Sequence, residues 1–137
     1  MTLKNTRKYS DVKVGEELPA LDIPITTTLI AGGAIATRDY YPGHHDRSAA
    51  RSLGSPDIFM NILTTNALVQ RFVENWTGPL AVINAVRIKL GTPNYPGDTM
   101  VLSGEVSSCN DHKVEITLKG KNSLGNHVTG TVTVALP

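Results

Sequence analysis

Cysteine is almost absent from this chain, since Cys109 is the only one among 137 residues. A single cysteine excludes an intrachain disulfide and a metal site built from several thiolates. Charged residues are also scarce, at 18%, and 13 lysines and arginines nearly balance 12 aspartates and glutamates. A nucleic-acid-binding surface usually needs a basic stripe, so we expect no nucleic-acid partner.

Long apolar runs are missing as well. No stretch of the sequence approaches the roughly 20 apolar residues that a membrane helix needs, and the first residues lack the apolar core of a secretory signal. We therefore expect a cytoplasmic protein with no membrane association. The length predicts a single domain over residues 1–137, in which residues 1–10 form a loose tail.

The remaining pattern is one early strand, short helices, one long helix and a series of later strands. Residues 21–25 alternate in polarity, which predicts a short strand. Because proline cannot donate to a ladder, we expect this strand to lie at an edge of the sheet or to have Pro24 facing outward. Apolar residues recur at helical spacing over residues 57–76, which predicts a helix of about 30 Å capped by Ser55 or Asp57.

Two short helices are expected before the long one. The first begins near Leu29 behind a run of threonines and contains Gly32 and Gly33, so it must pack closely to be stable. The second covers residues 47–53. Four strands are expected after the long helix, over residues 80–90, 99–107, 113–121 and 127–136. This order predicts an α+β domain with an antiparallel sheet wrapped on one long helix.

The clearest chemistry lies in the loop at residues 36–46. Asp39 and His44 stand five positions apart, separated by Tyr-Tyr-Pro-Gly, a composition typical of a turn. A helix would rotate two residues at this spacing off a common face, whereas an ordered loop can aim both side chains at one point. Two converging proton-transfer groups suit general acid–base catalysis. A solvated polar loop is the alternative interpretation.

The four histidines offer little support for a metal site. His45 and Asp46 extend the loop cluster, but adjacent residues rarely converge on one ion, so we expect structural contacts within the loop and no bound metal. His112 and His127 fall at the ends of expected strands, and we predict that both are exposed.

Four runs of the sequence together resemble the MaoC-like hydratases and dehydratases. Asp-Tyr-Tyr-Pro-Gly-His at residues 39–44 keeps the Asp, Pro and His of that family's Gly-Asp-x-Asn-Pro-x-His loop. The other runs are Val-Gly-Glu-Glu-Leu-Pro, Asn-Ile-Leu-Thr and Asn-Tyr-Pro-Gly-Asp-Thr, at residues 14–19, 61–64 and 94–99. The resemblance covers residues 12–136 and implies a single hot-dog fold.

Within that family, the chain resembles the small subunit of actinobacterial steroid side-chain enoyl-CoA hydratases. The runs that carry this resemblance are Ala-Thr-Arg-Asp, His-His-Asp, Asp-Ile-Phe and Asn-Ile-Leu-Thr, at residues 36–39, 44–46, 57–59 and 61–64. The resemblance implies a hydro-lyase that adds water to the C2–C3 double bond of a bulky 2-enoyl-CoA, with coenzyme A present only as part of the substrate. Asp39 and His44 are then catalytic, with Asp39 favoured as the base, although the residues leave that division open. Backbone amides near Asn61 would stabilise the thioester oxyanion.

Departures from the family pattern concern the substrate site. Arg38 replaces the usual Gly, Tyr41 replaces a common Asn, and Met60 and Asn61 replace His-Gly. Tyr41 and Gly43 are therefore candidate substrate-binding positions, and together with the Gly32–Gly33 pair they suggest a rearranged, roomier acyl site.

The resemblance also implies assembly, as a homodimer or as a heteromer with a second MaoC-like subunit, because one sheet leaves an edge and half a pocket uncovered. Three other functions remain open. They are a 3-hydroxyacyl-carrier-protein dehydratase subunit, which a basic patch would favour, a non-catalytic partner subunit, and a thioesterase using a carboxylate of the long helix. Four basic residues on the strands either meet the phosphates of coenzyme A or lie in solvent: Arg87, Lys89, Lys119 and Lys121.

Overall fold

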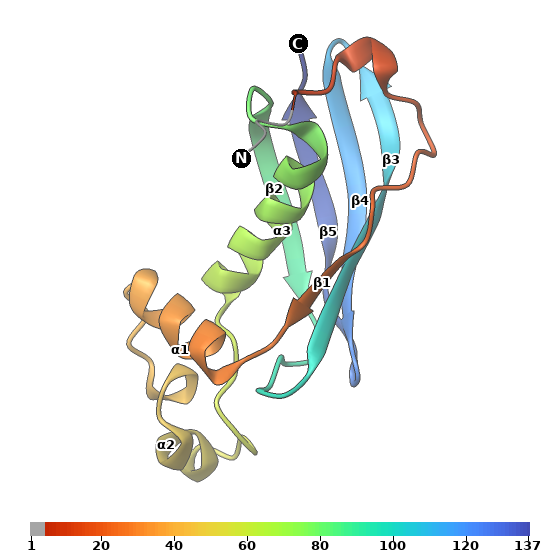
Figure 1. Cartoon of the computed structure of the whole chain (residues 1–137). Coiled ribbons are helices and arrows are strands. Elements are labelled where there is room, and N and C mark those ends of the chain that lie inside the picture. The colour runs from red at the N-terminus through yellow and green to blue at the C-terminus, as the bar shows by residue number, and fades with distance from the viewer. Residues whose placement is uncertain (1–4) are drawn as a thin grey trace.

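The computed structural model describes residues 5–137, which fold around one five-stranded antiparallel sheet. The strands stand in the order β1-β3-β4-β5-β2, and their bounds are β1 (Leu21–Pro24), β2 (Val82–Leu90), β3 (Thr99–Asn110), β4 (Lys113–Asn122) and β5 (Gly125–Ala135). The short β1, which contains Pro24, lies at one edge as predicted, and β2 forms the other. The long helix α3 (Ile62–Thr77) lies across one face of the sheet (Figure 1).

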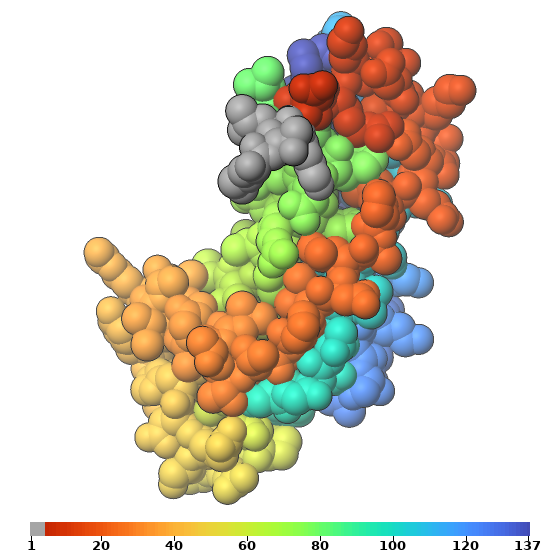
Figure 2. Space-filling model, viewed as in Figure 1, coloured from red at the N-terminus to blue at the C-terminus, as the bar shows by residue number. Residues whose placement is uncertain are grey.

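Two short helices precede α3 and form a lobe at one end of the molecule (Figure 2). They are α1 (Thr27–Ala36) and α2 (Arg47–Ser52), and a 3₁₀ turn, Pro42–His44, lies between them. Thr26 caps α1 by accepting a hydrogen bond from the Leu29 amide, as the threonine run predicted. Within residues 5–137 no helix is both long and apolar enough to cross a membrane.

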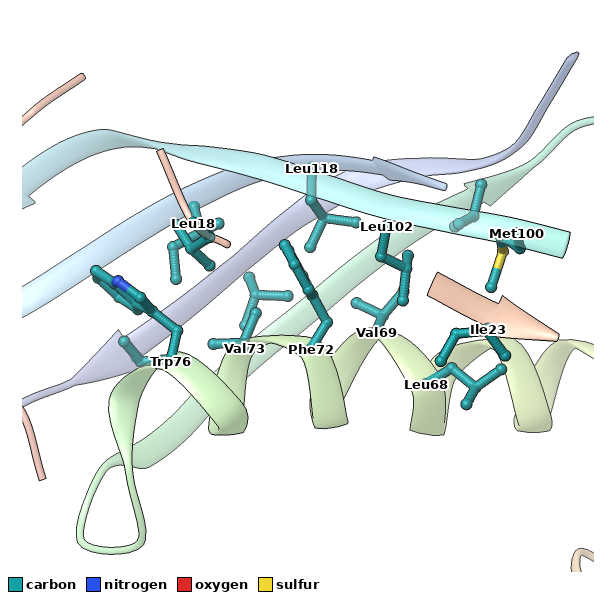
Figure 3. Close-up of a cluster of buried hydrophobic side chains, with 14 of the residues drawn as sticks. Leu18, Ile23, Leu68, Val69, Phe72, Val73, Trp76, Met100, Leu102 and Leu118 are labelled. Atoms are coloured by element: carbon teal, nitrogen blue, oxygen red, sulfur yellow. The ribbon is translucent and has the colours of Figure 1, made fainter. Parts of the chain in front are cut away.

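The core lies between α3 and the concave face of the sheet. Val69, Phe72 and Val73 are buried on the inner side of the helix, where Figure 3 shows them facing Leu102 and Leu118 of the sheet. Buried and exposed residues alternate along β4, because successive side chains of a strand point to opposite faces. This apolar layer packs α3 against the sheet.

The predicted start of the long helix is wrong. The helix begins at Ile62 and has 16 residues, or about 24 Å, and neither Ser55 nor Asp57 caps it. Residues 58–61 are not helical, and two of their amides have distant partners: Phe59 donates to the Gly43 carbonyl and Met60 to the Asn94 carbonyl. This segment reaches the loop at residues 39–44 instead of coiling.

The predicted loose tail also differs from the structure. The amides of Arg7 and Tyr9 donate to the carbonyls of Thr77 and Pro137, at 2.8 and 2.9 Å. Residues 5–10 are therefore held against the end of α3 and the end of the chain. The remainder of the predicted tail, residues 1–4, lies outside the described residues.

The two adjacent glycines of α1 provide a matched test of its packing on α3. A Cβ at Gly33 would overlap the Thr64 hydroxyl, whereas one at Gly32 would meet nothing within 4 Å. We expect Gly33→Ala to lower the free energy of unfolding by about 1–3 kcal/mol through overpacking. Gly32→Ala should raise it by up to about 1 kcal/mol through helix propensity. Urea denaturation measures both, and equal effects would show that α1 does not pack tightly on α3.

Candidate active site

Asp39 is placed by the way α1 ends. The Asp39 amide donates to the Ala34 carbonyl and the Arg38 amide to the Ile35 carbonyl, the paired bonds of a Schellman motif. Such an ending needs a residue with positive φ, and Arg38 has φ 55°. The usual family residue here, glycine, adopts this conformation without strain, which explains the family preference. Arg38 keeps the same turn, so its replacement of glycine leaves Asp39 in position.

His44 is placed by the 3₁₀ turn and by the segment before α3. Its Nδ1 lies 2.7 Å from the Phe59 carbonyl oxygen, and because a carbonyl only accepts, Nδ1 carries the proton. In the neutral ring Nε2 is then an acceptor, and it lies 3.4 Å from Asp39 Oδ2. Two acceptors so arranged can each take one hydrogen bond from a single water molecule.

The Asp39 carboxylate is stabilised in its charged form. Asn61 Nδ2 donates to Oδ2 at 3.0 Å and the Tyr41 amide donates to Oδ1 at 3.4 Å. The Asn61 hydrogen bond is the main cause that lowers the pKa of Asp39, with help from the Tyr41 amide and His44 and against a smaller effect of desolvation. The group is therefore ionised at neutral pH, as a proton acceptor must be.

Asn61 joins the pair to the long helix. It is the N-cap of α3, where its Oδ1 accepts from the Thr64 amide at 2.9 Å, while its Nδ2 is shared between Asp39 and the Thr37 hydroxyl. We predicted that backbone amides near Asn61 bind the oxyanion. The contact of the Asn61 side chain with Asp39 was not predicted. An asparagine directly before a helical apolar run is an N-cap signal, which could have located the side chain but not its second partner.

The structure gives Tyr41 and Gly43 a packing role beside His44. The ring centroids of Tyr41 and Phe59 lie 5.3 and 4.8 Å from that of His44. A Cβ on Gly43 would come within 2.6 Å of the Tyr41 ring and 3.0 Å of the Phe59 ring. Gly43 is thus buried under two aromatic side chains, which corrects the expectation that this glycine leaves spare room.

The other histidines and Asp46 behave differently from one another. His45 Nε2 lies 3.2 Å from the Tyr40 carbonyl oxygen, a contact within the loop as predicted. The side chain of Asp46 instead caps α2 by accepting from the Ala49 amide. Across residues 5–137, no group of three or more His, Cys, Asp and Glu side chains is placed to hold a metal ion.

The prediction that His127 is exposed is wrong, whereas His112 is exposed as predicted. His127 is 2% exposed because β5 begins at Gly125, which places His127 inside the strand with its ring toward α3. Its Nδ1 donates to the Thr92 carbonyl at 2.7 Å, and its Nε2 lies 2.8 Å from the Thr65 hydroxyl. Burial lowers the pKa of His127, against the effect of the Thr92 hydrogen bond.

The hydrogen bond from Asn61 to Asp39 can be tested by titration. Asn61→Ser keeps a capping oxygen for α3 but is too short to reach Asp39. Since that bond lowers the pKa of Asp39, its loss should raise the pKa. Asn61→Asp should raise it further, because a second carboxylate disfavours ionisation of the first. An NMR titration of the Asp39 carboxyl measures both shifts. An unchanged pKa in Asn61→Ser would show that the bond is unimportant.

Comparison with known proteins decides the family. Residues 11–128 match the MaoC-like domain family. The chain belongs to the MaoC-like domain family. The 3-oxo-4,17-pregnadiene-20-carboxyl-CoA hydratase β subunit of Mycobacterium tuberculosis is 46% identical over 123 residues, which cover 90% of this chain and 95% of that subunit.

Solved structures agree with this membership. A chain of the ChsH1–ChsH2 complex from Mycobacterium tuberculosis is 46% identical, with a TM-score of 0.89 over 91% of this chain and 98% of that one. The R-hydratase PhaJ1 of Pseudomonas aeruginosa is only 18% identical, yet has a TM-score of 0.88 over 96% of this chain and 86% of its own. The latter likeness shows the fold alone, and it confirms the predicted hot-dog fold of this MaoC-like chain.

Proposed function

We propose that this chain is the catalytic MaoC-like subunit of an enoyl-CoA hydratase that acts on a steroid side-chain thioester. The observation that carries the proposal is the Asp39–His44 pair, whose Oδ2 and Nε2 lie 3.4 Å apart. The two residues stand at the ends of the loop that resembles the family's Gly-Asp-x-Asn-Pro-x-His run. The 46% identity to a pregnadiene-carboxyl-CoA hydratase subunit supports the substrate class. A cytoplasmic location belongs to the same proposal, because a charged coenzyme A thioester does not cross membranes unaided.

The pair supplies the proton transfers of hydration. One water molecule donates hydrogen bonds to Asp39 Oδ2 and His44 Nε2, and its oxygen attacks C3 of the enoyl group. Asp39 accepts the proton that the water loses, and the electrons of the C2–C3 double bond move toward the thioester oxygen. The pair then returns a proton to C2, so that water is added and the protein is regenerated.

The negative charge on the thioester oxygen needs hydrogen-bond donors. The first turn of α3 provides backbone amides beside the pair, directly after Asn61, and the helix dipole favours an anion there. The Thr64 amide is occupied by Asn61 Oδ1, so we assign the oxyanion to the amides around Asn61, Ile62 and Leu63. Tyr41, at the outer side of His44, is the proposed contact for the acyl group.

The proposal includes a second MaoC-like subunit. The start of α3, the turn before the edge strand β2 and β2 itself carry several exposed apolar side chains, among them Ile62, Leu63, Leu80 and Val82. A groove of about 680 Å³ lies between that start of α3 and residues 86–89 of β2. Unpaired edges and apolar patches are normally covered, and the similar chain in the ChsH1–ChsH2 structure belongs to a complex.

The test uses the assembled protein. The chain is co-expressed with a second MaoC-like subunit from the same source, sized by light scattering, and assayed with crotonyl-CoA and with a ring-bearing enoyl-CoA. We expect a stable complex whose kcat/KM is higher for the ring-bearing substrate. A higher value for crotonyl-CoA would overturn the substrate class. A complex that hydrates neither thioester would overturn the function, and a stable, active monomer would overturn the assembly.

A further inference from the structure

Three consecutive residues carry the contacts that hold the catalytic pair. The Phe59 carbonyl accepts from His44 Nδ1, and the side-chain Nδ2 of Asn61 donates to Asp39 Oδ2. The residue between them, Met60, donates its backbone N–H to the Asn94 carbonyl at 3.1 Å. The position of the Asn94 backbone therefore influences the partners of both catalytic groups at once.

The backbone of Asn94 contacts Met60, and its side chain is held by Asn122. Asn94 is 0% exposed, and its Oδ1 accepts from Asn122 Nδ2 at 2.8 Å. Among residues 5–137, the hydrogen-bond partners of its Nδ2 are only two sulfur atoms, those of Met60 and Met100, at 3.7 and 3.4 Å. Because thioether sulfur is a weak acceptor, the bond from Asn122 is the strong one that orients the Asn94 side chain.

Asn122 ends β4 and ties the β4–β5 turn to the loop before β3. It is 5% exposed, and its Nδ2 donates to the Pro93 carbonyl at 2.9 Å as well as to Asn94. Its Oδ1 accepts from the Leu124 amide at 2.9 Å and the Gly125 amide at 3.2 Å. A buried amide with both ends satisfied is rigid, and leaving its partners unpaired is costly.

We propose that Asn122 is a positioning residue for the hydration, acting through Asn94 and Met60 on the geometry of Asp39 and His44. The inference rests on the proposed function and adds to it a buried residue at the end of β4 that does not touch the catalytic pair. Proton transfer to a water held between two groups tolerates little displacement, and an error of 1 Å can cost about 10²-fold in rate. The hydrogen bonds from Asn122 to Asn94 and from Met60 to Asn94 hold residues 59–61 in place and so prevent such displacement.

The neighbouring residue Ser123 provides a matched control. Its hydroxyl donates to Asp98 Oδ2 at 2.6 Å, so it ties the same turn to the other end of the same loop without reaching Asn94. In the assembled complex we expect Asn122→Ala to lower kcat by about 10-fold or more while KM changes by less than about twofold. Ser123→Ala should leave both near the wild-type values. Asn122→Ser keeps an acceptor for the turn amides and serves as the second variant if Asn122→Ala does not fold.

Two further readouts do not depend on turnover. In Asn122→Ala the pKa of Asp39 should rise, because Asn61 moves away, and ¹⁵N NMR should show a weakened preference for the Nδ1–H tautomer of His44. Ser123→Ala should change neither. If the wild-type complex hydrates no enoyl-CoA, the proposed function fails, and these two readouts still decide the role of Asn122. Equal effects of the two variants, or a loss of stability with unchanged kcat, tautomer and pKa, would overturn the positioning role.

Discussion

Asp39→Asn should lower the kcat of the assembled complex by about 10²–10⁴-fold, the usual contribution of a general acid–base group. The change keeps the size of the side chain and removes the carboxylate that accepts the proton. KM should change much less, because the groups that bind the acyl chain and coenzyme A lie outside the pair. Steady-state hydration of the preferred enoyl-CoA measures both constants.

His44→Gln should lower kcat by a similar factor, because glutamine is not a base that can hold and return the proton. If the two residues act on one water, their losses should not add, and the double variant should be little worse than the poorer single one. His45→Ala is the control, since His45 is exposed and its ring contacts the Tyr40 carbonyl of the same loop. His127 is unsuitable as a control because it is buried against α3.

One result would contradict the assignment of Asp39 as the base. If Asp39→Asn retained near-full activity in a folded, assembled complex, the chain would not supply the base. It would then be a partner subunit that completes the pocket of another MaoC-like chain. Losses that multiplied in the double variant would instead show that Asp39 and His44 act in separate steps.

Phe72→Ala should lower the free energy of unfolding by about 3–5 kcal/mol, a large part of the stability of a domain of this size. Phe72 is 2% exposed and fills the centre of the layer between α3 and the sheet (Figure 3). Its loss removes apolar burial and leaves a cavity that the surrounding strands cannot close. Urea denaturation of the isolated chain or the complex measures the change.

Leu124→Ala is the control for that experiment. Leu124 lies in the β4–β5 turn and is 56% exposed, so its truncation should change the free energy of unfolding by no more than about 0.5 kcal/mol. Similar losses in the two variants would mean that the core is not centred on Phe72.

Much of the architecture follows from local sequence. Alternating polarity and turn residues located all five strands, because both signals lie in the strand itself and in the residues next to it. The spacing of Asp39 and His44 around Pro42 predicted that the two side chains converge, since a short turn constrains both ends. The threonines before Leu29 located the start of α1 for the same reason, as a cap acts within three residues.

The tertiary structure decided the features that depend on distant partners. The long helix starts at Ile62 and not near Asp57 because the Met60 amide donates to the carbonyl of Asn94, a residue 34 positions away. His127 is buried because β5 faces α3 at that point, and the side chain of Asn61 reaches Asp39 only because two loops meet. Local propensity cannot specify such contacts, because their free energy comes from burial and hydrogen bonding between segments that only the folded chain brings together.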